Sequence, residues 1–203
     1  MINLESACIR NLRQYLDSLV PGMSDNDWRE LLSIGNLVRL EKGDELYPAA
    51  YYHDSVGFLL QGALRSYEKI SDREITFNLY LEHDVIVDYE SLKFGVPSRV
   101  TFKGQESSLL VQFDYQKLCT LFPKYPYVGQ LYRQLAELQC KTELDSRRFL
   151  LRMDATERYV FLLKSKPAYF QRFSLKDIAS YMGVTPTSLS RLRKIYKLEA
   201  PDS

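Results

Sequence analysis

The sequence has little cysteine and little histidine, and neither residue type forms a metal-binding pattern. Its three cysteines, Cys8, Cys119 and Cys140, are far apart and include no Cys-x-x-Cys pair, which argues against structural zinc and iron–sulfur sites. The two histidines, His53 and His83, form no His-x-His pair, so a metal enzyme is not expected. No nucleophile motif or phosphate-binding glycine loop occurs either. The sequence therefore predicts no metal site, no catalytic residue and no enzyme.

Long apolar runs are also missing. No run approaches the roughly 18 apolar residues that a membrane-spanning helix needs, so neither a membrane span nor a membrane partner is expected. Charged residues interrupt residues 1–20, which therefore lack the apolar centre of a secretory signal. Together with the unpaired cysteines, these absences predict a cytoplasmic protein.

The chain also lacks a strong net charge, but its charge is unevenly distributed. It has 203 residues, with 27 Lys and Arg, 26 Asp and Glu, and 45% hydrophobic residues, which is enough to form a folded core. Residues 151–203 contain ten basic and five acidic side chains, which leaves 17 basic and 21 acidic for residues 1–150. A basic C-terminal quarter on an acidic body indicates a polyanion as partner.

The spacing of apolar residues predicts two kinds of structure in the first two thirds of the chain. Helical spacing covers residues 4–19, and Ser24 caps a second short helix. From residue 37 to residue 113 the period changes to two, in short segments separated by Gly-containing turns. This pattern predicts an antiparallel sandwich or roll. Asp114 then caps a helix that Pro123 stops.

A long helix is expected after Pro126, followed by a helix that Asp154 begins with a capping box to Glu157 and that Pro167 ends. Apolar positions in the long helix repeat every three or four residues, as in a coiled coil. Two interpretations remain open, a helix packed on its own domain and a homodimer seam. The seam would consist of Val128, Leu131, Leu135, Leu138 and Thr142.

Residues 173–194, FSLKDIASYMGVTPTSLSRLRK, predict two helices joined by a tight turn. Ser174 caps the first helix and Gly183 provides the turn. Thr185 caps the second helix, and Pro186 occupies its first position. Small Ala179 allows the two helices to approach closely. This combination is typical of a helix-turn-helix.

The outer face of the second helix is polar and basic and carries no carboxylate. Hydroxyls and cations of this kind bind phosphates, and arginine also binds guanine. The alternative is a helical hairpin with an ordinary solvent-exposed face. The candidate DNA-binding residues are Thr185, Thr187, Ser188, Ser190, Arg191, Arg193, Lys194 and Lys197.

Nearly the whole chain resembles the cyclic-AMP receptor protein/fumarate–nitrate regulator (CRP/FNR) family of bacterial transcription factors. LEKGDELY and DSVGFLLQGALRSYE resemble roll strands of its cyclic-nucleotide-binding domain. IASYMGVTPTSLSRLRK is similar to the helix-turn-helix of a Bacteroidetes-type subgroup. The resemblance implies an α+β protein with an antiparallel double-stranded β-roll, or jelly roll, in residues 1–123. A long dimerisation helix in residues 124–152 and an all-α DNA-binding domain in residues 153–203 would follow.

The resemblance also implies a homodimer that reads double-stranded DNA at a pseudo-palindromic site with helix 185–197. Arg191 falls at the family's base-contacting arginine. Pro186 and Thr187 replace the arginine and glutamate that the family usually has upstream, which predicts a different target sequence.

Family members that bind cyclic AMP hold the ribose with Gly-Glu and the cyclic phosphate with Arg-Ser/Thr-Ala. The counterparts here are Val87-Asp88 and Ser98-Arg99-Val100, in which the arginine is displaced by one residue. Such a shift moves a side chain to the opposite face of a strand, so the phosphate clamp is expected to be broken. No cofactor is predicted. If the loop bends so that Arg99 turns inward, Asp88 and Arg99 are the candidate ligand-binding residues.

The resulting expectation is a DNA-binding regulator with a degenerate sensor, for which an unknown small-molecule effector and RNA polymerase are candidate further partners. The alternative is a small-molecule-binding or protein-interaction module that has lost DNA binding. The modest basicity and the few residues after the second helix, where the family often has a wing, motivate this alternative.

Overall fold

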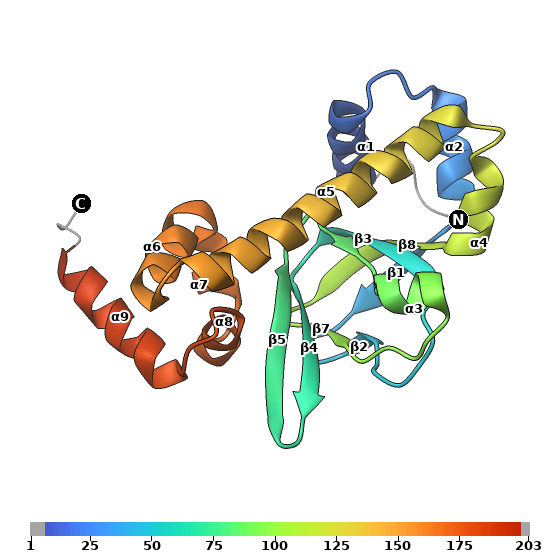
Figure 1. The fold of residues 1–203 in the computed structure, drawn as a ribbon. Coiled ribbons are helices and arrows are strands. Elements are labelled where there is room, and N and C mark those ends of the chain that lie inside the picture. Colours follow the sequence, from blue (N-terminus) through green and yellow to red (C-terminus); the bar gives the residue numbers. More distant parts are fainter. Residues whose placement is uncertain (1–6, 200–203) are drawn as a thin grey trace.

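A computed structural model describes residues 7–199 of the chain, with side chains up to residue 196. It has an antiparallel β-roll in its N-terminal half, one long helix that leaves the roll, and a group of helices at the C-terminal end (Figure 1). This arrangement confirms the predicted α+β class and the predicted order of roll, long helix and helical region.

Two four-stranded antiparallel sheets form the roll, with strand orders β1-β8-β3-β6 and β2-β7-β4-β5. The sheets enclose a core of apolar side chains that includes Leu59, Leu64 and Leu110, all fully buried. The strands are β1 (Gly35–Leu40), β2 (Glu45–Tyr47), β3 (Ser55–Gln61), β4 (Leu64–Ile70), β5 (Arg73–Tyr80), β6 (Val85–Ile86), β7 (Thr101–Gly104) and β8 (Ser108–Asp114).

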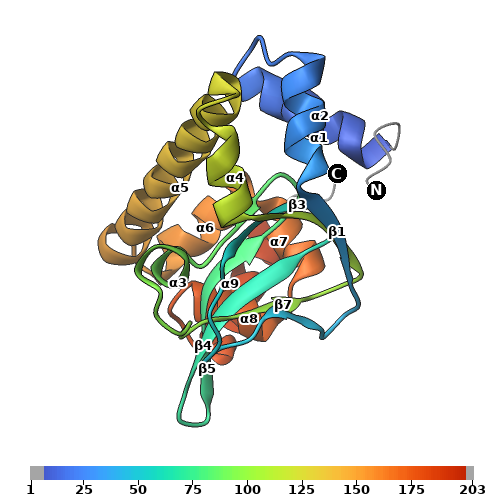
Figure 2. The same cartoon turned by 90° about the vertical axis from the view of Figure 1, so that its right-hand side faces the viewer.

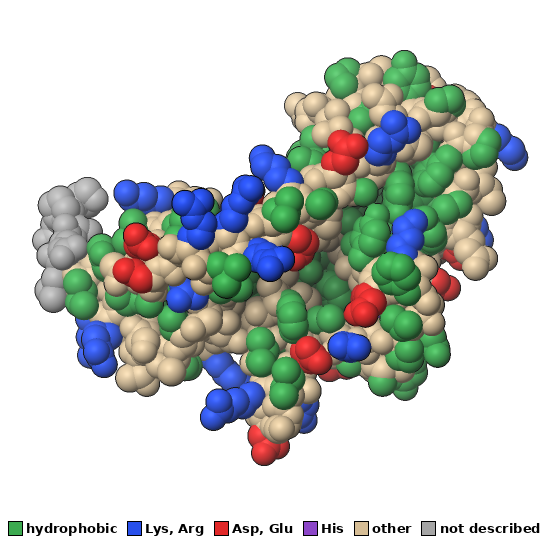
Figure 3. Space-filling view, viewed as in Figure 1, with side chains coloured by type: hydrophobic (Ala, Val, Ile, Leu, Met, Phe, Trp, Pro, Cys, Tyr) green, Lys and Arg blue, Asp and Glu red, His purple; other side chains and the backbone are tan. Residues whose placement is uncertain are grey.

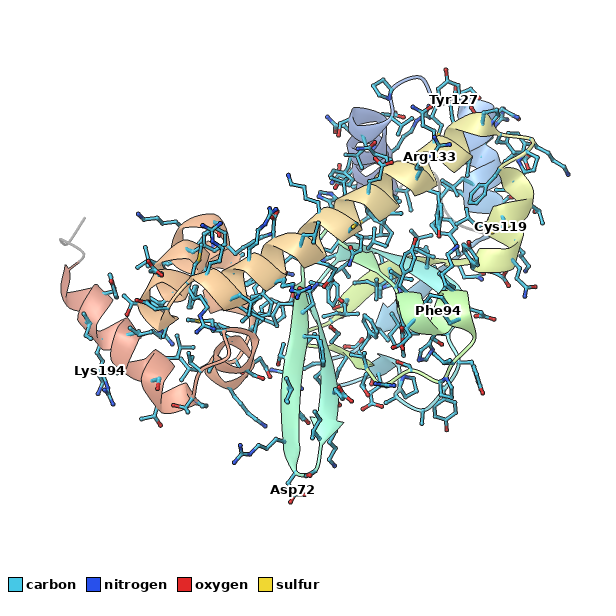
Figure 4. The ribbon with its side chains drawn as sticks, viewed as in Figure 1. Asp72, Phe94, Cys119, Tyr127, Arg133 and Lys194 are labelled. Atoms are coloured by element: carbon cyan, nitrogen blue, oxygen red, sulfur yellow. The ribbon has the colours of Figure 1, made fainter. Side chains whose placement is uncertain are left out.

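Strands β4 and β5 form a hairpin that extends beyond the rest of the roll, with Asp72 at its tip (Figure 4). The two strands pair from Leu64 opposite Tyr80 to Ile70 opposite Arg73. One strand of the hairpin, β5, is an edge strand of its sheet. The backbone hydrogen-bonding groups on the outer edge of β5 are therefore available to other parts of the chain.

Helices close one end of the roll. These are α1 (Ala7–Leu19), α2 (Asp25–Ser33) and α4 (Tyr115–Leu121), and the first turns of α5 (Pro126–Arg152) pack with them. Ser24 and Asp27 form a capping box at the start of α2, as the sequence predicts for Ser24. Asp114 caps α4 by accepting a hydrogen bond from the Lys117 amide at 2.9 Å.

The C-terminal helices have a core of their own, and α5 connects them to the roll (Figures 1 and 2). Leu162, Ile178, Met182 and Leu189 are almost completely buried there. Leu79 of β5 belongs to the same cluster, so the hairpin and the helices share packed surface. The helices are α6 (Ala155–Ser165), α7 (Pro167–Arg172), α8 (Leu175–Tyr181) and α9 (Pro186–Glu199).

Four short elements were not expected from the sequence. Strands β2 and β6 have three and two residues, too few for a period of two to be recognised. Helix α3 (Tyr89–Phe94) lies in the stretch that was interpreted only as a ligand loop. Pro167 follows the end of α6, as expected, but it also begins α7, which was not expected, and its missing amide hydrogen costs nothing in that first turn.

The predicted seam on the long helix does not form one exposed stripe, which corrects part of the sequence interpretation. Val128 and Leu131 are 1% and 4% exposed, because they pack against the helices that close the roll. Leu135 is half-buried against the same cluster, and Leu138 is also half-buried. Only Thr142 is exposed. Packing on the chain's own domain, the other interpretation, accounts for Val128 and Leu131.

No helix within the described part of the chain is long and apolar enough to cross a membrane.

Candidate functional site

Helices α8 and α9 form the helix-turn-helix pair that the sequence indicates. The Ser174 hydroxyl accepts a hydrogen bond from the Asp177 amide at 3.1 Å and so caps α8. Gly183 has a φ of +66°, a conformation that side chains rarely adopt, and the Val184 amide donates to the Ala179 carbonyl at 2.9 Å. Ala179 is fully buried where the helices meet. The turn is therefore fixed by backbone hydrogen bonds and by close packing.

Two of the predicted DNA-binding hydroxyls organise the start of α9. The Thr185 hydroxyl accepts from the Ser188 amide at 3.1 Å and lies 2.9 Å from the Ser188 hydroxyl. This is an N-cap, which satisfies an otherwise unpaired amide in the first turn. Thr185 and Ser188 therefore position the helix, a role that the sequence predicts for Thr185 only.

The remaining candidates lie on the exposed face of α9. Thr187, Ser190, Arg191, Arg193 and Lys194 are all exposed. None of the three cations forms an ion pair with a carboxylate of the described residues. Basic side chains project from the outer side of α9 in the space-filling view, and Lys194 points away from the body of the protein (Figures 3 and 4). The side chain of Lys197 lies outside the described residues.

A buried ion pair joins this helix pair to the roll. One guanidinium nitrogen of Arg65 in β4 donates a hydrogen bond to Asp177 of α8, and the other terminal nitrogen donates one to Glu74 of β5 at 2.5 Å. The side chains of Arg65 and Asp177 are only 5% and 9% exposed. The hydrogen bond from Arg65 lowers the pKa of Glu74, although burial acts in the opposite direction. Two carboxylates, one from the roll and one from α8, thus share one buried arginine.

Backbone groups of β5 strengthen this contact. The Ser180 hydroxyl accepts from the Thr76 amide at 2.9 Å and donates to the Glu74 carbonyl at 3.3 Å. The Tyr169 hydroxyl of α7 donates to the Leu79 carbonyl at 2.8 Å. The free edge of β5 is therefore occupied by the C-terminal helices.

A second ion-pair group lies beside the first. Arg172 of α7 donates to both oxygens of Glu82, at 2.6 and 2.8 Å, and to Glu106 at 2.5 Å. Burial would raise the pKa of Glu82, but hydrogen bonds from Arg172 and from the Gly62 amide outweigh it and lower this pKa to about 2. Sequence reasoning missed both groups, because their members are up to 112 residues apart.

A cavity of about 430 Å³ lies between the β4–β5 hairpin and α5, lined mainly by aromatic and aliphatic side chains. Apolar side chains border this hollow in the space-filling view (Figure 3). Its walls come from Ser66 of β4, from Phe77, Asn78 and Tyr80 of β5, and from residues 87–89. One face of α5, with Glu143 among its residues, forms the remaining wall.

The two residues predicted as candidate ligand contacts are not brought together at this cavity. Asp88 lines it and is 8% exposed, while it also caps α3 by accepting from the Ser91 amide at 3.1 Å. Arg99 is exposed and is not among the lining residues. The loop therefore does not turn Arg99 into the cavity. Nor do any three His, Cys, Asp or Glu side chains of the described residues gather as metal ligands.

Comparison with known proteins gives the fold of the chain. No protein-family model matches the sequence, and no curated protein sequence matches it. The structure is similar to FixK2 from Bradyrhizobium japonicum, with a TM-score of 0.67 and 22% identity over 82% of this chain and 86% of FixK2. It is also similar to CLP, the c-di-GMP responsive global regulator of Xanthomonas campestris, with a TM-score of 0.67 and 14% identity over 86% and 94% of the two chains.

A third similar structure is a protein of Eubacterium rectale assigned to the CRP/FNR family of transcriptional regulators. Its TM-score is 0.64, with 13% identity over 90% of this chain and 88% of that one. The chain therefore has the CRP/FNR-type fold. These comparisons do not bear on the Bacteroidetes-type subgroup, which stays a prediction from sequence.

Proposed function

We propose that the chain is a DNA-binding transcriptional regulator of the CRP/FNR type that acts as a homodimer. The observation that carries the proposal is the exposed face of α9, which presents Arg191, Arg193 and Lys194 without a carboxylate partner among the described residues. Unpaired cations on the second helix of a helix-turn-helix are suited to the phosphates and base edges of a major groove. The fold supports the same function, which is not enzymatic.

Each residue of α9 would have a distinct part in this function. Arg191 would read a base, with Thr187 and Ser190 beside it. Arg193, Lys194 and Lys197 would bind phosphates and hold the protein on the duplex. The hydroxyls of Thr185 and Ser188 would fix the first turn of the helix at the groove.

The second half of α5 is the surface that we propose for the dimer. Leu144 and Leu151 are 51% and 73% exposed and lie seven residues apart, which places them on one helix face. Leu144 and Leu151 replace the buried Val128 and Leu131 as candidate contacts, whereas Leu138 and Thr142 lie on the opposite side of the helix and do not belong to this face. Two copies joined there would present two α9 helices to successive major grooves.

The cavity does not favour cyclic AMP as the effector. A cyclic phosphate needs a cation or several amide donors in place of its lost water. Among the side chains that line the cavity there is no Lys, Arg or His. Cyclic AMP is therefore not proposed as a ligand, and RNA polymerase stays a candidate partner only.

The test is a fluorescence-anisotropy titration with DNA from upstream of the gene and with a random duplex, at two salt concentrations. Arg191→Ala should reduce the discrimination between the correct and the incorrect base pair at one position of the site by about 1–3 kcal/mol. Lys194→Ala should weaken binding to all sequences alike and reduce the salt slope by about one. Lys124→Ala, an exposed lysine between α4 and α5, is the matched control and should bind as the wild type does.

Wild-type binding by both α9 variants would contradict the assignment of this face. If the wild type binds both duplexes weakly and equally, and salt does not change this binding, the alternative is favoured. The chain would then be a small-molecule-binding or protein-interaction module that has lost DNA binding.

A further inference from the structure

The cavity between the hairpin and α5 is large enough for a bicyclic small molecule. Its volume of about 430 Å³ is within the range of sites that hold organic ligands. Aromatic rings from three parts of the chain line it, among them Tyr80, Tyr89 and Phe102. Tyr80 and Phe102 are 6% and 3% exposed, so they belong to the floor, whereas Phe77 is 55% exposed and lies at the mouth. A flat, apolar molecule fits such a lining.

The charged groups of the cavity have one sign. Its only charged lining residues are Asp88 and Glu143. An anion in this space would lose water and meet two carboxylates, which costs free energy that nothing in the lining recovers. A cation would gain from both carboxylates and from the faces of the aromatic rings.

At the floor, Asp88 has free hydrogen-bonding capacity. The residue is 8% exposed, and one of its carboxylate oxygens accepts a hydrogen bond from the Ser91 amide. Among the described residues no donor reaches its other oxygen, which is not completely enclosed by protein atoms. A carboxylate oxygen that lacks a donor and borders a cavity is a natural site for a cationic N–H group.

At the mouth, Glu143 is the second carboxylate. It lies on the face of α5 that also presents Ala136, Gln139 and Cys140 to the cavity. It forms no ion pair with a described residue, and although the residue is exposed overall, partial burial of its carboxyl group raises the pKa of that group. A cation close to it would offset this cost of burial.

From these features we infer that the cavity binds a small aromatic molecule with a cationic nitrogen, such as an aryl-alkyl amine. The ring would lie among Tyr80, Tyr89 and Phe102, and the ammonium group would be held by Asp88 and Glu143. This inference concerns the cavity alone, so it does not depend on DNA binding by α9.

The experiment is calorimetric titration of the full chain, without DNA, by three indole compounds that share the ring system and carry a short side chain of different charge. Tryptamine is a cation, tryptophol is neutral and indole-3-acetate is an anion at neutral pH. Tryptamine should bind about tenfold or more tightly than tryptophol, as a hydrogen bond to a charged group provides, and indole-3-acetate should bind weakest.

Two conservative variants connect this order to the two carboxylates. Asp88→Asn keeps an N-cap for α3, since Asn caps as well as Asp does, and Glu143→Gln keeps the shape of an exposed side chain. Each should reduce the preference for tryptamine over tryptophol several-fold, and the double variant should abolish it. Glu137→Gln, an exposed α5 carboxylate outside the cavity lining, should keep the wild-type order.

Equal binding of tryptamine and tryptophol, tightest binding of indole-3-acetate, or no binding of any of the three at about millimolar concentration would overturn the inference. An unchanged preference in the double variant would overturn it as well. Because no DNA is present, none of these results bears on the proposed function of α9.

Discussion

Arg65 of β4 and Asp177 of α8 form a buried ion pair that joins the roll to the helix-turn-helix pair. Glu74 shares the same guanidinium, and Ser180 bonds to the backbone of the adjacent strand. The Nε of Arg65 is buried and has no hydrogen-bond partner among the described residues. Asp177 and Glu74 are thus the charge partners of the arginine, whose guanidinium carbon also lies 4.3 Å from the centroid of the Tyr67 ring.

Replacing Arg65 should weaken the contact between the roll and the helix-turn-helix pair and lower the free energy of unfolding. Arg65→Met would leave Asp177 buried without its partner, and such a loss costs about 3–5 kcal/mol of unfolding free energy. The double variant Arg65→Met/Asp177→Asn should lose about 1–3 kcal/mol less unfolding free energy than the sum of the losses in the two single variants. Urea denaturation of all three variants and the wild type measures this coupling energy. Strict additivity of the two changes would show that the pair does not couple the roll to α8.

Acid should weaken the second ion-pair group. The folded-state pKa of Glu82 is lowered to about 2 from an ordinary value of 4.5. A depressed carboxyl pKa contributes stability that is complete above about pH 4.5 and is lost as the pH falls through about 2. Wild type should therefore lose more stability than Glu82→Gln when melting temperatures are compared from pH 5 downwards. Parallel profiles for the two proteins would exclude a contribution from this carboxylate.

A methyl group at Gly62 should be poorly tolerated. Gly62 has a φ of +103°, and a Cβ there would lie 2.2 Å from the Ser108 hydroxyl and 2.6 Å from the Ser108 Cα. Gly62→Ala should cost more than the roughly 1–3 kcal/mol of backbone strain alone. Gly43→Ala is the control, because Gly43 has a φ of +99° but no atom within 4 Å of its Cβ position. Equal denaturation midpoints for the two variants would show that Ser108 moves aside without cost.

Local signals made most of the fold predictable. The cap at Ser174, the left-handed turn at Gly183 and the proline at the start of α9 are each specified by neighbouring residues, so the helix-turn-helix could be located from sequence. The strands longer than three residues followed from a period of two, which needs several residues to be visible. Strands β2 and β6 were missed for that reason.

The candidate site was less predictable, because its contacts are not local. Helical spacing marked Val128 and Leu131 as apolar, but it could not show that the helices closing the roll would cover them. The part of Ser188 in the cap of α9 was not recognised from sequence, and its contact with DNA stays a prediction. The pair of Arg65 and Asp177 carries no sequence signal, since 112 residues separate its members.

Strand β5 forms part of the cavity wall and also contacts the C-terminal helices. Phe77, Asn78 and Tyr80 line the cavity, whereas the backbone at Glu74, Thr76 and Leu79 holds α7 and α8. A ligand whose binding displaces this strand therefore changes the free-energy differences between the possible positions of α9. Thermodynamic linkage then requires reciprocity: by whatever factor such a ligand changes the affinity for DNA, DNA changes the affinity for the ligand by the same factor.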